Sequence, residues 1–140
     1  MDVEIRPFAE RDRAQVIALW TEVFAGDPPW NEPSAMIDRK LRVQRELFLV
    51  AVAAGEVAGT VLAGFDGVRG WIHHLAVLPA HRRRSAATQL VQAAERGLAN
   101  LGCPKINLQV RAGNAGAIAF YRALGYQVED RASLGKRLEG

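Results

Sequence analysis

The sequence predicts a mixed α/β (α+β) fold in which helices pack on one central sheet. Three observations carry this prediction: the chain has 140 residues, 49% are hydrophobic and 24% charged, and stretches that alternate apolar and polar residues are interspersed with stretches of helical periodicity. The length favours one domain over residues 1–140, and the composition excludes a disordered or collagen-like chain. The expected element order is β-α-α-β-β-β-α-β-α-β-β, with about seven strands and four helices.

The N-terminal part of the chain is expected to form a strand and two helices. Residues 3–6 alternate apolar and polar and precede a proline, which is typical of a strand. Asp12 is a candidate N-cap because apolar residues at helical spacing follow it as far as Val23. Residues 26–29, with the sequence Gly-Asp-Pro-Pro, end that helix. A second helix is expected over residues 33–45.

The apolar stretch Leu47–Phe65 is interpreted as a hairpin of buried strands rather than as a membrane helix. Its nineteen residues carry one charge, at Glu56, and approach the length that spans a bilayer. Gly55 and Glu56 interrupt the stretch in its middle, however, and the runs on both sides consist of β-favouring residues. We therefore expect two strands joined by a turn, and no membrane segment.

The C-terminal half is expected to alternate strands with helices. The elements are a strand over residues 71–77, a long helix from Ser85 to Gly102, a strand over 106–110, a helix from Asn114 to Gly125, and final strands over Tyr126–Asp130 and Ser133–Leu138. The two glycines are typical residues just after a helix, and Asn114 is a favourable N-cap. Exposed strands near the C-terminus are compatible with a homodimer.

The run His81-Arg82-Arg83-Arg84, just before the helix expected at Ser85, is the most informative charged segment. A helix start leaves backbone N–H groups unpaired and carries a partial positive charge, which suits a phosphate. Two other interpretations are a solvated basic turn and a nucleic-acid patch; the run is short and lacks interleaved aromatic residues, which disfavours the patch. The glycine spacing excludes a Walker loop and a dinucleotide fingerprint.

Two segments resemble the signatures of the GCN5-related N-acetyltransferase (GNAT) family in its short, single-domain bacterial form. In the first, Leu75–Ala87, the residues Arg82-Arg83-Arg84-Ser85-Ala86-Ala87 are similar to the acetyl-CoA-binding pattern Gln/Arg-x-x-Gly-x-Gly/Ala. The second, Asn114–Tyr126, is similar to the pattern Asn-x-x-Ala-x-x-x-Tyr-x-x-x-Gly-Phe/Tyr. The resemblance covers nearly the whole chain and implies the family fold, a mixed and mostly antiparallel sheet flanked by helices.

The resemblance also implies roles for individual residues. Backbone groups of Leu75 and Val77, with Ala76 between them, would hold the acetyl carbonyl and the pantetheine arm of acetyl-CoA. Asn114 would bind the pantetheine side, and Tyr121 would sit near the sulfur and protonate the leaving thiolate. The residues that would hold the pyrophosphate form one continuous loop: Arg82, Arg83, Arg84, Ser85, Ala86, Ala87 and Thr88.

Two positions depart from the family pattern. Ser85 stands where the family has glycine; a requirement for positive φ would make serine costly, whereas helical dihedrals would free its hydroxyl to donate to the pyrophosphate. We expect acetyl-CoA binding to survive, because Ala87 fits the last position of the pattern and Arg84 is retained. Gln109 stands where a related subgroup, which acetylates a ribosomal protein, has a glutamate base. An amide cannot accept that proton, so the resemblance does not supply the base.

Other residues are candidates for the acceptor side. His73 and His74 are adjacent on an expected strand and should point to opposite faces, so that one of them could face the cleft and act as a base. For either histidine alone, packing in the core is the favoured explanation. Asp27 and Glu32, in the loop between the first two helices, could contact an amine because the resemblance places that loop beside the acceptor.

The expected function is therefore acetyl transfer from acetyl-CoA to an amine by direct attack in a ternary complex, with Tyr121 as the general acid. The acceptor stays open among a small amine, an amino acid and a protein amino group. The alternatives are a module that binds acyl-CoA without turnover and a nucleic-acid-associated protein that uses the arginines. One cysteine, Cys103, excludes an internal disulfide and a multi-cysteine zinc site, and no metal is expected. No secretory signal follows Met1, so the expected location is the cytoplasm.

Overall fold

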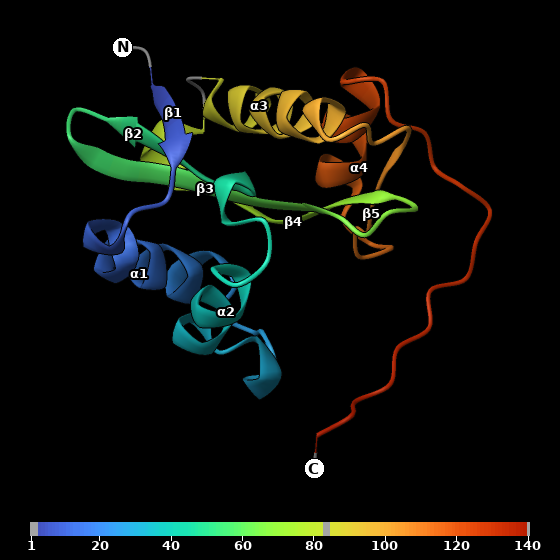
Figure 1. Cartoon of the computed structure of the whole chain (residues 1–140), viewed down its shortest axis with the longest axis horizontal. Coiled ribbons are helices and arrows are strands. Elements are labelled where there is room, and N and C mark those ends of the chain that lie inside the picture. The colour runs from blue at the N-terminus through green and yellow to red at the C-terminus, as the bar shows by residue number, and fades with distance from the viewer. Residues whose placement is uncertain (1–2, 83–84, 140) are drawn as a thin grey trace. The chain divides into compact units, whose positions relative to one another are not determined.

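The computed structural model describes residues 3–82 and 85–139 (Figure 1). The chain divides into two compact units, Met1–Gln109 and Val110–Gly140. Among the described residues, no helix has both the length and the apolar character that crossing a bilayer requires. The same ranges contain no group of three or more His, Cys, Asp or Glu side chains that could hold a metal ion.

The first unit is a five-stranded sheet with helices on both faces. In chain order its elements are β1 (Glu4–Pro7), α1 (Arg13–Val23), α2 (Pro33–Lys40), β2 (Phe48–Ala53), β3 (Glu56–Phe65), β4 (Gly70–Val77), α3 (Ala86–Asn100) and β5 (Ile106–Leu108). The strands lie in the order β1-β2-β3-β4-β5, antiparallel as far as β4 and parallel between β4 and β5. Helices α1 and α2 cover one face of this sheet and α3 covers the other (Figure 1). The predicted mixed α/β class is confirmed.

The hairpin predicted within Leu47–Phe65 is confirmed by the antiparallel pairing of β2 with β3. The two residues that connect the strands, Ala54 and Gly55, have φ values of 52° and 79°. A two-residue hairpin turn of type I′ requires positive φ at both positions. Gly55 adopts this conformation freely, whereas Ala54 does so with a Cβ in place.

The main core lies between the sheet and the helices α1 and α2. The ring of Phe48 on β2 stacks on Phe8 and on Trp20 of α1, with centroid separations of 4.4 and 5.9 Å. Around these rings lie the buried residues Val16, Leu19, Ile37, Val50, Val57, Leu62 and Ala76. On the other face, α3 buries the stripe Leu90, Val91, Ala94 and Leu98, which is the helical spacing that predicted this helix.

Asp12 precedes α1 as predicted, but its side chain does not cap that helix. The carboxylate, in a residue only 3% exposed, accepts two hydrogen bonds from the Arg6 guanidinium, at 2.7 and 3.0 Å, and one from the amide of Ala9 at 2.9 Å. The bond from Arg6 is the main reason that the pKa of Asp12 lies below its ordinary value. The pair therefore ties the entry of α1 to β1.

Helix α2 ends at Lys40, five residues before the predicted end at Arg45. Gln44 explains the early end because it adopts a left-handed φ of 49° and uses its side chain as a partner for β3. Its Nε2 donates to the carbonyl of Phe65 at 2.9 Å, and the amide of Phe65 donates to its Oε1 at 2.7 Å. A contact with a residue 21 positions away thus overrides the local helical pattern.

The second unit contains α4 (Ala115–Ala123), which the sequence predicted correctly. Its N-cap is Asn114, whose Oδ1 accepts a hydrogen bond from the amide of Ala117 at 3.0 Å. Gly125 follows the helix with φ of 98°, as expected for a residue that ends a helix.

The two C-terminal strands predicted over Tyr126–Asp130 and Ser133–Leu138 are wrong. The described part of this segment forms no strand, so the sheet has five strands rather than about seven, and the full predicted element order is not observed. Two-stranded pairing needs an apolar face that is buried. The apolar residues of this segment do not provide one: Val128 is 63% exposed, and Leu134 and Leu138 are each 91% exposed.

Candidate functional site

Strand β4 contains a bulge at the position where the sequence placed the start of the cofactor site. The pairing register between β3 and β4 shifts after Thr60, so that His74 and Leu75 together lie opposite the single residue Val61. His74 takes the extra position with a left-handed φ of 49°. A bulge of this kind interrupts the ladder and turns the strand locally.

Beyond the bulge, β4 presents one edge that the described strands leave uncovered. Its parallel pairing with β5 ends at Ile72. The amide of Leu78 donates to the carbonyl of Ala58 on β3 at 2.8 Å. Because alternate residues of a strand direct their backbone groups to opposite sides, Leu75 and Val77 direct theirs away from β3. These are the two residues whose backbone was expected to bind acetyl-CoA, whereas the intervening Ala76 directs its groups toward β3.

The start of α3 follows this edge in the chain after the connection 78–85, which contains the 3-10 helix Pro79–His81. The amides of Ala86, Ala87 and Thr88 precede the first hydrogen bond of the helix, which runs from Gln89 N to Ser85 O at 3.0 Å. The Ser85 side chain does not cap them; its hydroxyl instead accepts a hydrogen bond from Gln89 Nε2 at 3.0 Å. Amides left in this way, followed by small side chains, suit the close approach of an anion.

Ser85 has φ of 57° and ψ of 16°, so the position does require the left-handed conformation. Of the two alternatives for this serine, the structure therefore supports the costly one, in which glycine would fit without strain. Arg82 links the loop to the open edge, since its Nε donates to the carbonyl of Val77 at 3.3 Å. Arg83 and Arg84 lie outside the described residues.

Both histidines of β4 lie on the face covered by α1 and α2, so the prediction of opposite faces is wrong. His73 pairs directly with Leu62, a member of the core on that face. The His74 ring contacts Trp20 and Phe24, with centroid separations of 4.9 and 4.6 Å. The bulge is the physical reason, because the extra residue breaks the two-residue alternation between His73 and the rest of the strand.

His74 also meets the loop that follows α1. Its Nε2 lies 3.8 Å from Oδ2 of Asp27, and its side chain is only 13% exposed. Burial lowers the pKa of His74 below its ordinary value; Asp27 opposes this shift and His73 adds to it. The imidazole is therefore neutral at pH 7 and able to accept a proton.

The other acidic candidate of that loop has a structural task. The carboxylate of Glu32 accepts hydrogen bonds from the amides of Ser34 and Ala35, at 3.0 and 2.8 Å. It thereby caps the N-terminus of α2. Asp27 is thus the acidic residue of this loop that lies beside a histidine.

The second unit holds the remaining two candidates, Asn114 and Tyr121. The Asn114 side chain caps α4, as described above, and the residue is exposed. Tyr121 is half-buried, and its ring packs edge-on against Phe120 and Tyr126 with centroid separations of 5.1 and 5.5 Å. Burial raises the pKa of Tyr121 to about 12, so its phenol is protonated throughout the physiological range.

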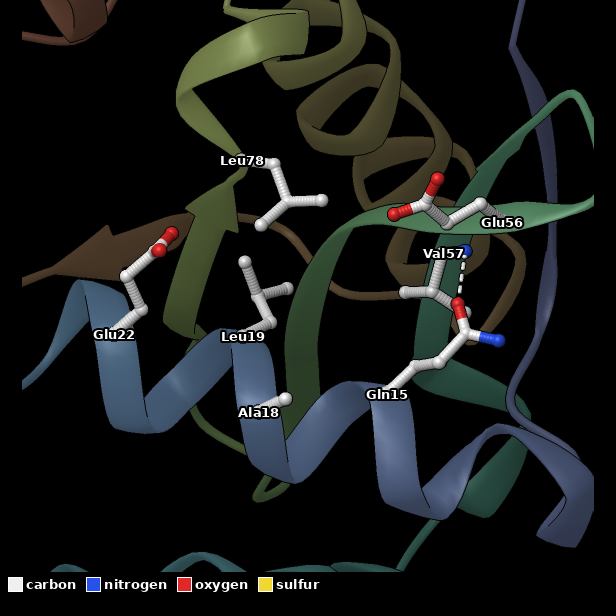
Figure 2. Close-up of a pocket in the computed structure, with 7 residues that line it drawn as sticks. All are labelled: Gln15, Ala18, Leu19, Glu22, Glu56, Val57 and Leu78. Carbon is white, nitrogen blue, oxygen red and sulfur yellow. Dashed lines mark hydrogen bonds between the residues drawn. The ribbon is translucent and has the colours of Figure 1, made fainter.

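A small cavity of about 170 Å³ lies between α1, the start of β3 and the residue after β4 (Figure 2). Its lining residues are Gln15, Ala18, Leu19, Glu22, Glu56, Val57 and Leu78. Gln15 accepts a hydrogen bond from the amide of Val57 at 2.7 Å. None of these residues belongs to the site predicted from the sequence.

The chain is similar to known proteins along most of its length. The family model described as "Acetyltransferase (GNAT) family" matches residues 14–126. An acetyltransferase of Sodalis glossinidius is 44% identical over 137 residues, which cover 97% of this chain and 96% of that protein.

Solved structures share the fold. The Ard1 protein of Thermoplasma volcanium superposes with a TM-score of 0.83 and 24% identity, covering 92% of this chain and 85% of that one. AAC(6′)-Iy, in complex with the bisubstrate analogue CoA-S-monomethyl-acetylneamine, superposes with a TM-score of 0.81 and 21% identity, covering 98% and 99%.

Proposed function

Because this chain belongs to the GNAT family of acetyltransferases, we propose that it transfers the acetyl group of acetyl-CoA to a primary amine by direct attack in a ternary complex. The observation that carries the proposal is the open edge of β4 at Leu75 and Val77, which the chain follows with the uncapped amides at the start of α3. The pantetheine arm of acetyl-CoA is extended and could pair with the β4 edge, and the pyrophosphate at its far end could then meet the amides at the start of α3. A protein of the same fold, AAC(6′)-Iy, binds a CoA conjugate.

The residues present fit acetyl-CoA. The edge offers the backbone groups of Leu75 and the N–H of Val77 in the extended geometry that a pantetheine amide can pair with, while the Val77 carbonyl accepts from Arg82. Amides of the loop from Arg82 to Thr88 would hold the pyrophosphate, with Arg83 and Arg84 adding positive charge. Bound acetyl-CoA supplies an acetyl group activated as a thioester. An N–H of the β4 edge directed at the carbonyl oxygen stabilises the negative charge that develops there during attack.

Tyr121 is the proposed general acid, and Asn114 the proposed partner of the pantetheine arm. A thiolate leaving group departs more easily when a donor protonates it. The phenol is protonated at neutral pH, since burial raises its pKa to about 12, and it can therefore donate a hydrogen bond to the sulfur as the thiolate forms. The ring contacts of Tyr121 with Phe120 and Tyr126 limit the directions in which the hydroxyl can point.

His74 is the proposed proton acceptor for the attacking amine. An amine attacks only when neutral, so a base must remove one proton from its ammonium form. The neutral imidazole of His74 supports this role, and Asp27 stabilises the imidazolium once the proton has moved. Gln109, which replaces the glutamate of a related subgroup, then needs no part in proton transfer.

The test has two measurements. Thermal unfolding with and without acetyl-CoA tests binding; at about 100 times Kd the ligand should stabilise the fold by about 2.7 kcal/mol. Release of free thiol from acetyl-CoA is then followed across a panel of small amines, amino acids and peptides with free N-termini. Stabilisation together with amine-dependent thiol release is the expected result.

Other outcomes would contradict the proposal in distinguishable ways. Stabilisation by acetyl-CoA without thiol release for any amine would favour a module that binds acyl-CoA without turnover. Failure of acetyl-CoA to stabilise the protein, together with DNA or RNA binding that weakens steeply with salt, would favour the nucleic-acid interpretation of the arginines.

A further inference from the structure

A buried chain of two hydrogen bonds connects α1 to the bulge of β4. The indole Nε1 of Trp20 donates to Oγ1 of Thr60 at 2.8 Å, and that hydroxyl donates to the carbonyl of His74 at 3.0 Å. Thr60 is fully buried and Trp20 is 2% exposed. We call Trp20, Thr60 and the His74 carbonyl the Thr60 relay. Sequence reasoning assigned no role to Thr60 because an isolated threonine in an apolar strand carries no functional signal.

The relay satisfies a group that the bulge displaces from the ladder. His74 is the extra residue of β4, so its carbonyl is out of register with the backbone donors of β3. A buried carbonyl without a donor is unfavourable, and the Thr60 hydroxyl supplies that donor. The same Trp20 whose indole supports Thr60 also contacts the His74 ring. Both the backbone and the side chain of His74 are therefore held from α1.

The strands are close-packed at the same point. A Cβ on Gly59, the neighbour of Thr60, would lie 2.8 Å from the carbonyl oxygen of Ala76 and 3.2 Å from a methyl of Val77. The β4 segment just after the bulge is thus closely packed against β3 at Gly59. This packing and the relay at the bulge together hold the segment in place.

We propose that Thr60 and Trp20 are positioning residues for acetyl-CoA binding, an inference that rests on the proposed function. The relay holds His74 in its left-handed conformation, and this conformation determines which way Leu75 and Val77 direct their backbone groups. Without the Thr60 donor, a slip of β4 by one residue becomes favourable, because the His74 carbonyl then accepts a hydrogen bond from a backbone amide of β3. That slip would turn the backbone groups of Leu75 away from the open edge and toward β3.

The experiment compares acetyl-CoA affinity among variants that keep or remove the hydrogen-bonding groups of the relay. Thr60→Val keeps the shape and removes the hydroxyl; Thr60→Ser keeps the hydroxyl; Trp20→Phe removes the indole donor. Ile37→Val is the matched control, because it removes one methyl from the same core without touching the relay. Affinity is measured by titration calorimetry well below the unfolding temperature of the least stable variant.

Thr60→Val is expected to raise the Kd for acetyl-CoA about tenfold, while Thr60→Ser and Ile37→Val stay within about twofold of the wild type. Amide NMR shifts of Leu75 and Val77 in the free protein should change in Thr60→Val and not in Ile37→Val. A Thr60→Val protein that is less stable but binds acetyl-CoA like the wild type, with unchanged shifts of those two amides, would overturn the inference.

Two further outcomes are decisive. If Thr60→Val does not fold, Trp20→Phe takes its place, because loss of the indole donor weakens the same hydroxyl while keeping an aromatic ring against His74. A Trp20→Phe protein with wild-type affinity and unshifted amides would then overturn the inference. A wild-type protein that fails to bind acetyl-CoA would overturn the proposed function and the positioning role together, whereas selective loss in the variants supports both.

Discussion

Replacing Ser85 by glycine perturbs the start of α3 in a way that separates backbone strain from ligand contact. Ser85 carries a Cβ at φ of 57°, where only glycine is free of steric conflict with the following carbonyl. Its hydroxyl makes one exposed hydrogen bond, from Gln89 Nε2. The substitution removes both the Cβ and this bond and leaves the helix sequence otherwise intact.

The expected change in folding stability is a small increase. A non-glycine residue in the left-handed region costs about 1–2 kcal/mol. Glycine offsets about 0.4–1 kcal/mol of this relief, because it increases the conformational entropy of the unfolded chain. Because the bond to Gln89 is exposed and contributes little, Ser85→Gly should stabilise the protein by about 0.5–1 kcal/mol, a rise in Tm of about 2–4 °C for a chain of this length.

Calorimetry and urea unfolding measure the change, and Ser85→Ala is the matched control. Alanine loses the hydroxyl but keeps the Cβ, so it should show no gain. A Ser85→Gly protein that is less stable than the wild type, or a Ser85→Ala protein with the same gain, would refute the strain argument. Acetyl-CoA affinity should be kept or tightened in Ser85→Gly; a loss of tenfold or more would show that the hydroxyl is a direct ligand.

Four other substitutions test separate parts of the structure. Tyr121→Phe should lower kcat by roughly 10²–10⁴-fold while the Kd for acetyl-CoA stays within about twofold, measured by thiol release and calorimetry; unchanged turnover would remove the phenol from the chemistry. Gly59→Ala should destabilise the fold by about 1–3 kcal/mol in urea unfolding, because its Cβ would meet a β4 carbonyl at 2.8 Å, whereas Gly26→Ala, which faces open space, should not. Asp12→Asn should lower the free energy of unfolding by about 2–4 kcal/mol at pH 7. The pKa of Asp12 is depressed in the folded protein, so its contribution to stability is present above the ordinary pKa. The difference in stability from the wild type should therefore shrink as pH falls below about 4. Because the folded pKa values of His73 and His74 both lie below the ordinary value of 6.5, wild-type stability should fall as pH drops below 6.5. His74→Asn, which tolerates the same positive φ, should remove the part of this fall that His74 contributes.

The parts of the fold that the sequence predicted are those in which local pattern and burial agree. The hairpin followed from two β-favouring runs around Gly55, and α3 followed from an apolar stripe that is fully buried. The early end of α2 was not predictable, because it depends on a side-chain contact between Gln44 and the distant Phe65. The prediction of C-terminal strands was wrong for the opposite reason. Residues such as Val128 and Leu134 alternate with polar neighbours, but their side chains are exposed and form no buried face.

The candidate site divides in the same way. The loop before α3 is predicted as a cofactor site because its arginines and small residues occur in a continuous motif. The same motif singles out Ser85, which the structure places at a left-handed φ. The bulge could not be identified, since nothing in the sequence of β4 marks His74 as an extra residue. Thr60 was missed for the same reason, because its role exists only where the bulge places a carbonyl beside its hydroxyl.

The extra residue divides β4 into two segments whose side chains alternate out of step with each other, so the strand does not tolerate the loss of a residue at this point. Side chains before His74 and side chains after it each alternate regularly, but the two series are offset by one residue. Deleting one residue there would exchange the faces of all side chains before it. Relative to Ala76, His73 would turn to the α3 face and Ile72 to the α1 face. The number of residues in this strand is therefore set by the packing on both faces of the sheet, in addition to the chemistry proposed for His74.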